Sequence, residues 1–138
     1  MENSPVMTLD PEALRSAMRA WSAGVTVVTA VHGEDRHGMT VNSFASISLN
    51  PAVVSLSLQK NTRTHELVMH SRVFGVTETI ATGSPFILGG LAWFDCRVSQ
   101  TFDVGASTHM IAEVLAVREF GGEPLVYHNR EYWKLSQL

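Results

Sequence analysis

Short runs of β-branched or alternating residues recur along most of the chain, and turn-forming residues separate them. Residues 25–31 read VTVVTAV, and residues 52–59 read AVVSLSLQ, in which larger apolar residues alternate with smaller or polar ones. Asn50-Pro51 and Gly121-Gly122 are typical of turns between such runs. Short strands divided at regular spacing by turn signals are typical of antiparallel barrels and sandwiches. The sequence therefore predicts a mainly β fold with a few short helices.

The expected helices lie before the first strand and near the middle of the chain. Asp10-Pro11-Glu12 combines an N-cap, a proline suited to the first helical position and an acidic residue. We expect this helix to run to Gly24, with an apolar face that includes Leu14, Met18 and Trp21. The remaining expected elements are a polar hairpin connection at 32–38, strands at 39–49, 52–59, 72–77, 90–102 and 108–120, a helix from Thr62 to His70, a loop at 82–85, and a strand pair within 125–135.

Composition excludes several classes of protein. The formal net charge is −3, which is opposite to what a nucleic-acid binder working by bulk charge needs. The single cysteine, Cys96, cannot form an internal disulfide, and no apolar run approaches the length of a membrane span. We expect no nucleic-acid or membrane partner, a cytoplasmic location, an N-terminal tail at 1–9 and one domain at 10–138.

Motifs for side-chain catalysis and metal binding are missing from the sequence. The chain has six histidines but no HExxH pattern, and it has neither of the two common phosphate-binding glycine motifs. We therefore expect no metal site. Cys96 follows Trp93 and Phe94 in a predicted strand, where a small buried residue is the simplest interpretation.

Two polar segments are unusual for the elements that they occupy. Residues 39–49 read MTVNSFASISL, a weak core strand that either presents hydroxyl groups to solvent or receives a flat polar ligand. Residues 60–64 read KNTRT before a predicted helix, which is either an ordinary N-cap with a solvated arginine or a phosphate seat. The residues alone leave both alternatives open.

The order of these segments resembles one known family. AWSAGVTVVTA, HGMTVNSFASISLNPAVVSLSL and QKNTRTHELV are followed by LGGLAWFDCRV and PLVYHNREYWKL. Together they resemble the short-chain flavin reductases of the FMN-binding split-barrel family, from about Leu14 to Leu135. The resemblance implies a six-stranded antiparallel split β-barrel, a homodimer, binding of FMN or FAD, and reduction of that flavin by NADH or NADPH, with the product supplied to a partner monooxygenase.

The resemblance also implies roles for individual residues. The flavin ring would lie along one polar segment, the phosphate along the other, and a C-terminal stretch would face the nicotinamide. The implied ring residues are Thr40, Val41, Asn42, Ser43, Ala45 and Ser46; the phosphate residues are Asn61, Thr62, Arg63 and Thr64; the nicotinamide-side residues are His128, Arg130 and Tyr132. No catalytic acid or base is needed, since hydride transfer is the chemistry of the cofactor.

The chain departs from the family pattern at two places. Relatives usually carry Gly-Asp-His-Thr where this chain has Gly105-Ala106-Ser107-Thr108, so His109 does not inherit the family histidine's role. Between Thr77 and Glu78 roughly twenty or more residues of the family pattern are missing. Either a helix is deleted or the sequence omits a segment, and we favour the second because both flanks match. These departures keep two alternatives open: a flavin-binding electron carrier or sensor, and a binding module that has lost flavin reductase activity.

Overall fold

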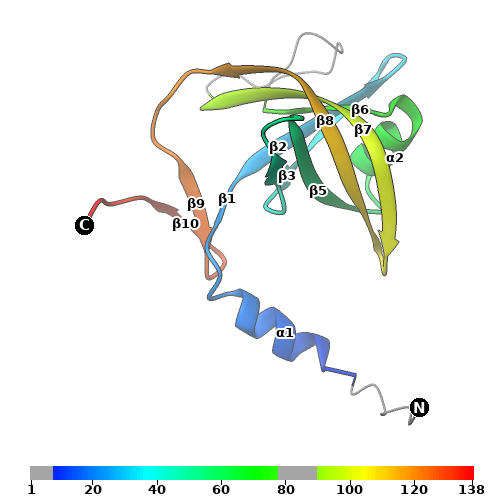
Figure 1. The fold of residues 1–138 in the computed structure, drawn as a ribbon. Helices are drawn as coiled ribbons and strands as arrows, with labels where there is room; N and C mark the ends of the chain where they lie inside the picture. Colours follow the sequence, from blue (N-terminus) through cyan, green and yellow to red (C-terminus); the bar gives the residue numbers. More distant parts are fainter. Residues whose placement is uncertain (1–7, 78–89) are drawn as a thin grey trace.

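The computed structural model describes residues 8–77 and 90–138, and Figure 1 shows their arrangement. The expected loop at 82–85 and the residues that follow Thr77 lie outside these ranges. The described elements are α1 (Pro11–Met18), β1 (Ala23–Gly24), β2 (Thr26–His32), β3 (Asp35–Val41), β4 (Ala45–Ser48), β5 (Val53–Gln59), α2 (Arg63–Ser71), β6 (Val73–Val76), β7 (Ala92–Val104), β8 (Ser107–Glu119), β9 (Leu125–His128) and β10 (Glu131–Lys134). No helix within the described ranges has the length and apolar character that a membrane crossing requires.

The main sheet has seven strands in the order β3-β2-β6-β7-β8-β5-β4, and its neighbours pair antiparallel. A mainly β, antiparallel fold with few helices is therefore confirmed. The number of strands differs from the expected six. The polar segment that the sequence predicts as one strand at 39–49 divides into the end of β3 and the separate β4.

The curled sheet brings its two ends together through a side chain. Ser43, in the gap between β3 and β4, accepts a hydrogen bond from Ser57 N at 2.9 Å and donates one to Ser57 O at 3.2 Å. Val41 at the end of β3 is also buried in the same cluster as Leu56 and Leu58 of β5. The packing of Val41 and the hydrogen bonds of Ser43 thus join the end of β3 to β5. Within the described residues, β3 and β4 are not paired with each other.

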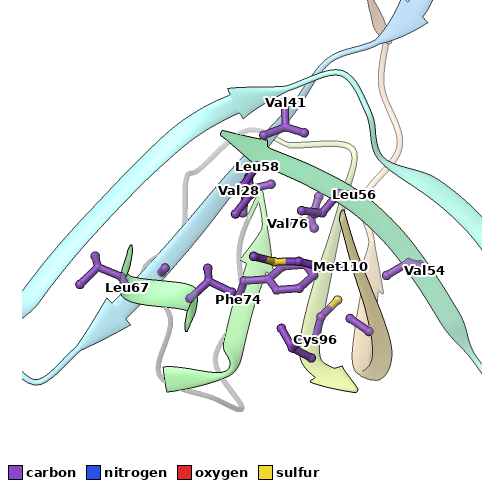
Figure 2. Close-up of a cluster of buried hydrophobic side chains, with 14 residues drawn as sticks. Val28, Val41, Val54, Leu56, Leu58, Leu67, Phe74, Val76, Cys96 and Met110 are labelled. Atoms are coloured by element: carbon purple, nitrogen blue, oxygen red, sulfur yellow. The ribbon is translucent and has the colours of Figure 1, made fainter. Parts of the chain in front are cut away.

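The core lies inside this curled sheet. Its fully buried side chains come from five strands and from α2, and Figure 2 shows them converging on one interior. Phe74, Leu56 and Met110 are 0% exposed. Cys96 is also buried here, which confirms it as a core residue, and burial together with the charge of Asp95 raises the pKa of its thiol to about 12.

A second unit, which we call the arm, comprises residues 8–24 and 125–138, which include α1, β1, β9 and β10. Strands β1, β9 and β10 form their own three-stranded sheet, and α1 projects beyond it in Figure 1. Asn129 N donates to Arg19 O at 3.0 Å, which ties the end of α1 to the β9–β10 turn. None of the buried residues of the described chain belongs to the arm.

The expected hairpin and first helix are present, but the boundaries predicted for both are wrong. Residues 32–38 are mostly paired strand, because Gly33 (φ 63°) and Glu34 make a two-residue turn and β3 is an edge strand that tolerates charge. The first helix ends at Met18 rather than near Gly24, and tighter hydrogen bonds of the i to i−3 type follow it as far as Trp21.

Candidate functional site

The expected ring segment, Thr40 to Ser46, leaves the sheet ladder in its middle. Thr40, Asn42, Ala45 and Ser46 are exposed. The side chain of Val41 points into the core, so that residue offers a ligand only its backbone. Ser43 thus holds the segment against Ser57 of β5, while the polar side chains of Thr40, Asn42 and Ser46 remain exposed.

Two cavities lie along this segment and share Asn42 and Tyr127. The smaller, of about 260 Å³, is lined by Val25, Thr40, Val41, Asn42, Tyr127 and Tyr132. The larger, of about 590 Å³, is lined by Arg15, Met18, Arg19, Trp21, Ala23, Asn42, Ser43, Phe44, Ala45, Tyr127, Asn129 and Arg130. The structure therefore brings most of the expected ring residues together with Tyr132 and Arg130. Ser46 and His128 are not among the lining residues of either cavity.

His128 is half-buried at the end of β9, beside these cavities. Its Nδ1 lies 3.0 Å from Ser22 Oγ, and its ring meets that of Trp133 edge-on at 6.2 Å between centroids. Trp133 Nε1 also donates to the backbone carbonyl of His128 at 3.0 Å. These contacts fix the imidazole within the arm and leave its Nε2 for other partners.

The expected phosphate residues surround the first turn of α2. Thr62 caps this helix: its Oγ1 accepts from His65 N at 3.3 Å and donates to Gln59 O at 2.7 Å. Asn61 is exposed, whereas Thr64 is fully buried, with its hydroxyl 2.8 Å from His37 Nδ1. A cavity of about 530 Å³ lies beside this turn and includes Asn61, Thr62 and Arg63.

Arg63 already has two carboxylate partners. Its guanidinium pairs with Asp35 of β3 and, at 2.8 Å, with Glu66 one turn further along α2. The hydrogen bond from Arg63 lowers the pKa of Glu66, so this carboxylate is charged at neutral pH. An incoming phosphate would have to compete with both carboxylates for the guanidinium.

The β7–β8 hairpin adds a further polar layer beneath α2. Thr108 hydroxyl lies 2.8 Å from His65 Nε2 and donates to Asp103 at 3.3 Å. Burial, followed by the nearby charge of Lys60, lowers the pKa of His65. Lys60 N also donates to Ala106 O at 2.9 Å. The turn in which the chain departs from the family pattern therefore lies directly beside the phosphate seat.

The two polar segments are linked through β5. Ser43 is hydrogen-bonded to Ser57, and Asn61 follows Ser57 by four residues, a stretch that spans at most about 14 Å. His109 Nδ1 lies 2.8 Å from Ser57 Oγ on the other side. The two polar segments therefore lie close to each other on the same side of β5.

Sequence reasoning missed several residues that line the cavities. Tyr127 lines both, and Arg15, Arg19, Trp21 and Phe44 line the larger one. Phe44 and Tyr127 lie within segments that the sequence singled out. Arg15, Arg19 and Trp21 lie in or just after α1. Their position beside the ring segment depends on the tertiary placement of the arm.

The family model of the flavin reductase like domain matches residues 18–77 and 75–136 of this chain. The two matched ranges overlap just before the Thr77-Glu78 junction, where residues of the family pattern are missing from this sequence. FMN reductase (NADH) SmoA of Agrobacterium fabrum is 32% identical, with 91% of this chain and 86% of that protein covered. Its alignment runs over 150 positions, which exceeds the 138 residues of this chain.

Other relatives agree in sequence and in structure. NADH-dependent flavin reductase StyB of Pseudomonas fluorescens is 33% identical over 84% of this chain and 83% of that protein. The styrene monooxygenase flavin reductase of Pseudomonas putida S12 superimposes with a TM-score of 0.83 at 33% identity, over 91% of this chain and 98% of that chain. Flavin reductase HpaC, solved with NADP⁺, superimposes with a TM-score of 0.85 at 29% identity, over 94% and 100%. On these matches the chain belongs to the flavin reductase like domain family.

Proposed function

We propose that this protein is an NADH-dependent flavin reductase that uses FMN or FAD and supplies the reduced flavin to a partner monooxygenase. The observation that carries the proposal is the open polar segment at Thr40–Ser46, bordered by two cavities that share Asn42 and Tyr127. Relatives named as NADH-dependent FMN or flavin reductases support the donor and the acceptor. NADPH is the alternative donor, since HpaC was solved with NADP⁺.

The residues present fit a flavin. Thr40 and Asn42 would offer the ring edge short polar groups, Ser43 would hold the segment in place through Ser57, and Ala45 and Ser46 would leave space for a flat ring beside them. Asn61 and the guanidinium of Arg63 would bind the phosphate, with Thr64 contributing its backbone N–H and Thr62 holding the turn as the cap of α2. A bound flavin supplies the hydride acceptor, and the protein supplies orientation around it.

The nicotinamide side is formed by the arm. Tyr132 lines the smaller cavity next to Thr40 and Asn42, where its ring would border a bound ring system. His128 is held by Ser22 through Nδ1, so its Nε2 would be available to a carboxamide. Neither side chain would need to move a proton, because hydride transfer is chemistry that the bound cofactors would supply.

Several relatives are reductase components of two-component oxygenases. One is the reductase component of 4-hydroxyphenylacetate 3-monooxygenase of Thermus thermophilus, and another serves a tryptophan halogenase. The openness of the ring segment in this chain suits a flavin that leaves after reduction. A monooxygenase that takes up free reduced flavin is therefore the proposed partner.

The arm supports a homodimer. Leu14 and Met18 on α1 are 54% and 52% exposed, and Leu135 after β10 is 67% exposed. An amphipathic helix normally covers its apolar face, and the described residues leave the face of α1 with Leu14 uncovered. A second copy that packs against this arm removes the apolar area from water. We also propose that residues 10–138 form one domain and that its curled sheet is the family's split barrel.

We expect the protein in the cytoplasm, which supplies NADH.

Absorbance spectroscopy tests the proposed function. The purified protein with NADH and FMN, FAD or riboflavin should oxidise NADH, followed at the nicotinamide band, only when flavin is present. Loss of Arg63 (Arg63→Gln) should raise the KM for FMN by about tenfold and leave that for riboflavin, which has no phosphate, unchanged. A yellow protein without turnover would favour the electron carrier, and failure to bind any flavin would favour the binding module.

A further inference from the structure

The larger cavity combines positive charge with aromatic surface. Three of the ten basic residues of the chain, Arg15, Arg19 and Arg130, line it, together with Trp21 and Tyr127. No carboxylate side chain appears among its described lining residues, although the chain as a whole carries a net charge of −3. The local charge is therefore opposite to that of the molecule, and it favours an anionic ligand.

Among the residues that the structure describes, Arg19 and Arg130 form no ion pair. Arg19 Nε is buried and has no hydrogen-bond partner among the described residues. Arg130 is exposed and occupies a left-handed conformation (φ 64°) as the second residue of the Asn129-Arg130 turn. Glycine suits that position of a two-residue hairpin turn far better than arginine. Arg15 pairs with Glu12 at the surface.

The cavity lies next to the proposed ring site. It shares Asn42 and Tyr127 with the smaller cavity and also reaches Ser43 and Ala45. A nicotinamide seated at Asn42 must extend the rest of its dinucleotide away from the flavin. The arginine-lined cavity of about 590 Å³ is the adjoining space, and its size is typical of small-molecule sites.

We propose that Arg15, Arg19 and Arg130 bind the diphosphate of the nicotinamide dinucleotide, with Trp21 and Tyr127 offering aromatic faces to its adenine. Guanidinium groups match phosphate oxygens with paired, charge-assisted hydrogen bonds, and planar bases stack on aromatic side chains. This inference rests on the proposed reductase function and names the residues that recognise the part of the donor remote from the hydride.

A comparison of two donors tests this inference. NADH carries the diphosphate and the adenosine, whereas reduced nicotinamide riboside carries neither. With Arg19→Gln or Arg130→Gly, kcat/KM for NADH should fall about tenfold or more, mainly through KM. The value for the riboside should change less than twofold, and so should the dissociation constant of FMN. Arg36→Gln, at the far end of β3 from Asn42, is the matched control for loss of a surface arginine.

Arg130→Gly separates function from folding. Glycine relieves the left-handed conformation of the turn, so the melting temperature should stay the same or rise while activity with NADH falls. Equal losses with both donors, or no loss with NADH, would overturn the proposal and leave the reductase function standing. If the wild-type protein oxidises no NADH with any flavin, calorimetric titration with ADP tests the diphosphate site separately. ADP binding that Arg19→Gln weakens would support the site, and no binding of ADP by the wild type would reject it.

Discussion

The seven-stranded main sheet with α2, a unit that we call the barrel although its sheet is not closed, and the arm are built from similar residues but differ in what covers them. Leu56, Phe74 and Met110 of the barrel are 0% exposed, whereas Leu14 and Leu135 of the arm are more than half exposed. Both units carry the alternation or the helical periodicity that normally marks a buried face. The difference teaches that apolar periodicity identifies a face to be covered, and that the covering surface need not belong to the same chain.

The proposed site lies where these two units meet. The barrel contributes the polar segment between β3 and β4, and the arm contributes Tyr127, Tyr132 and the arginines. Ser43 and Ser57 hold the proposed flavin side against the core. The proposed donor side lies on the arm, and the hydrogen bond of Asn129 N with Arg19 O joins two parts of that arm to each other.

The largest expected contrast comes from the same substitution made in each unit. Leu56→Ala removes a fully buried side chain from the barrel and should lower the free energy of unfolding by about 2–5 kcal/mol. Leu135→Ala in the arm, where the side chain is 67% exposed, should change the free energy of unfolding of the monomer, at dilutions that separate the two copies, by less than about 0.5 kcal/mol. Urea denaturation followed by circular dichroism measures both, and equal effects would remove the distinction between the two units.

A charge on the arm should act on assembly instead of on folding. Leu14→Asp places a carboxylate on the exposed apolar face of α1, and burying that charge against a second copy is costly. We expect the dimer dissociation constant to rise at least a hundredfold, measured by sedimentation velocity, while the unfolding transition of the barrel is retained. Glu113→Leu on β8, outside the arm, controls for a change of surface charge. Unchanged assembly of the Leu14 variant would exclude α1 from the interface.

Local patterns predicted most elements of the fold. The Asp10 cap, the alternation in β5, the Thr62 cap of α2 and the hairpin around Asn129-Arg130 all follow from short-range chemistry. The break between β3 and β4 did not, because Ser43 leaves the ladder to bond with β5, a strand fourteen residues away. Contacts of this kind depend on how the sheet curls.

The candidate site divides in the same way. The polar segment at 39–49 was conspicuous because hydroxyls and amides are poor core residues, and the KNTRT segment because it begins a helix. Arg15 and Arg19 carry no such signal, since arginines on a surface helix are common. The pairing of β1 with β9, the contact of Ser22 with His128 and the hydrogen bond between the end of α1 and the β9–β10 turn bring them to the ring segment.

Lowering the pH should destabilise the hydrogen-bonded layer of His65 and Thr108 beneath α2. Burial lowers the pKa of His65 below its ordinary value of 6.5, so the folded protein binds this proton less readily than the unfolded chain. The contribution is fully present above pH 6.5 and is lost as the pH falls through the folded-state pKa. His65→Asn, whose side chain can still bond with Thr108, should therefore flatten the loss of stability below pH 6.5. Urea titrations at a series of pH values measure this slope, with His70→Asn on the exposed face of α2 as the control.

The smallest expected effect concerns the competition for Arg63. The hydrogen bond from Arg63 lowers the pKa of Glu66, so this carboxylate, ionised at neutral pH like an ordinary glutamate, stays charged to lower pH, and the exposed pair is screened by solvent. Glu66→Gln frees the guanidinium for a phosphate and removes a negative charge beside it, so FMN should bind about two- to fivefold more tightly in a fluorescence titration. Riboflavin affinity should stay constant, and Glu113→Gln, which breaks the remote pair with Arg97, should alter neither. Weaker FMN binding in the Glu66 variant would instead mean that this carboxylate orients Arg63 toward the phosphate. The phosphate side of the proposed site would then be positioned by an ion pair before the ligand binds, unlike those arginines of the arm that form no ion pair among the described residues.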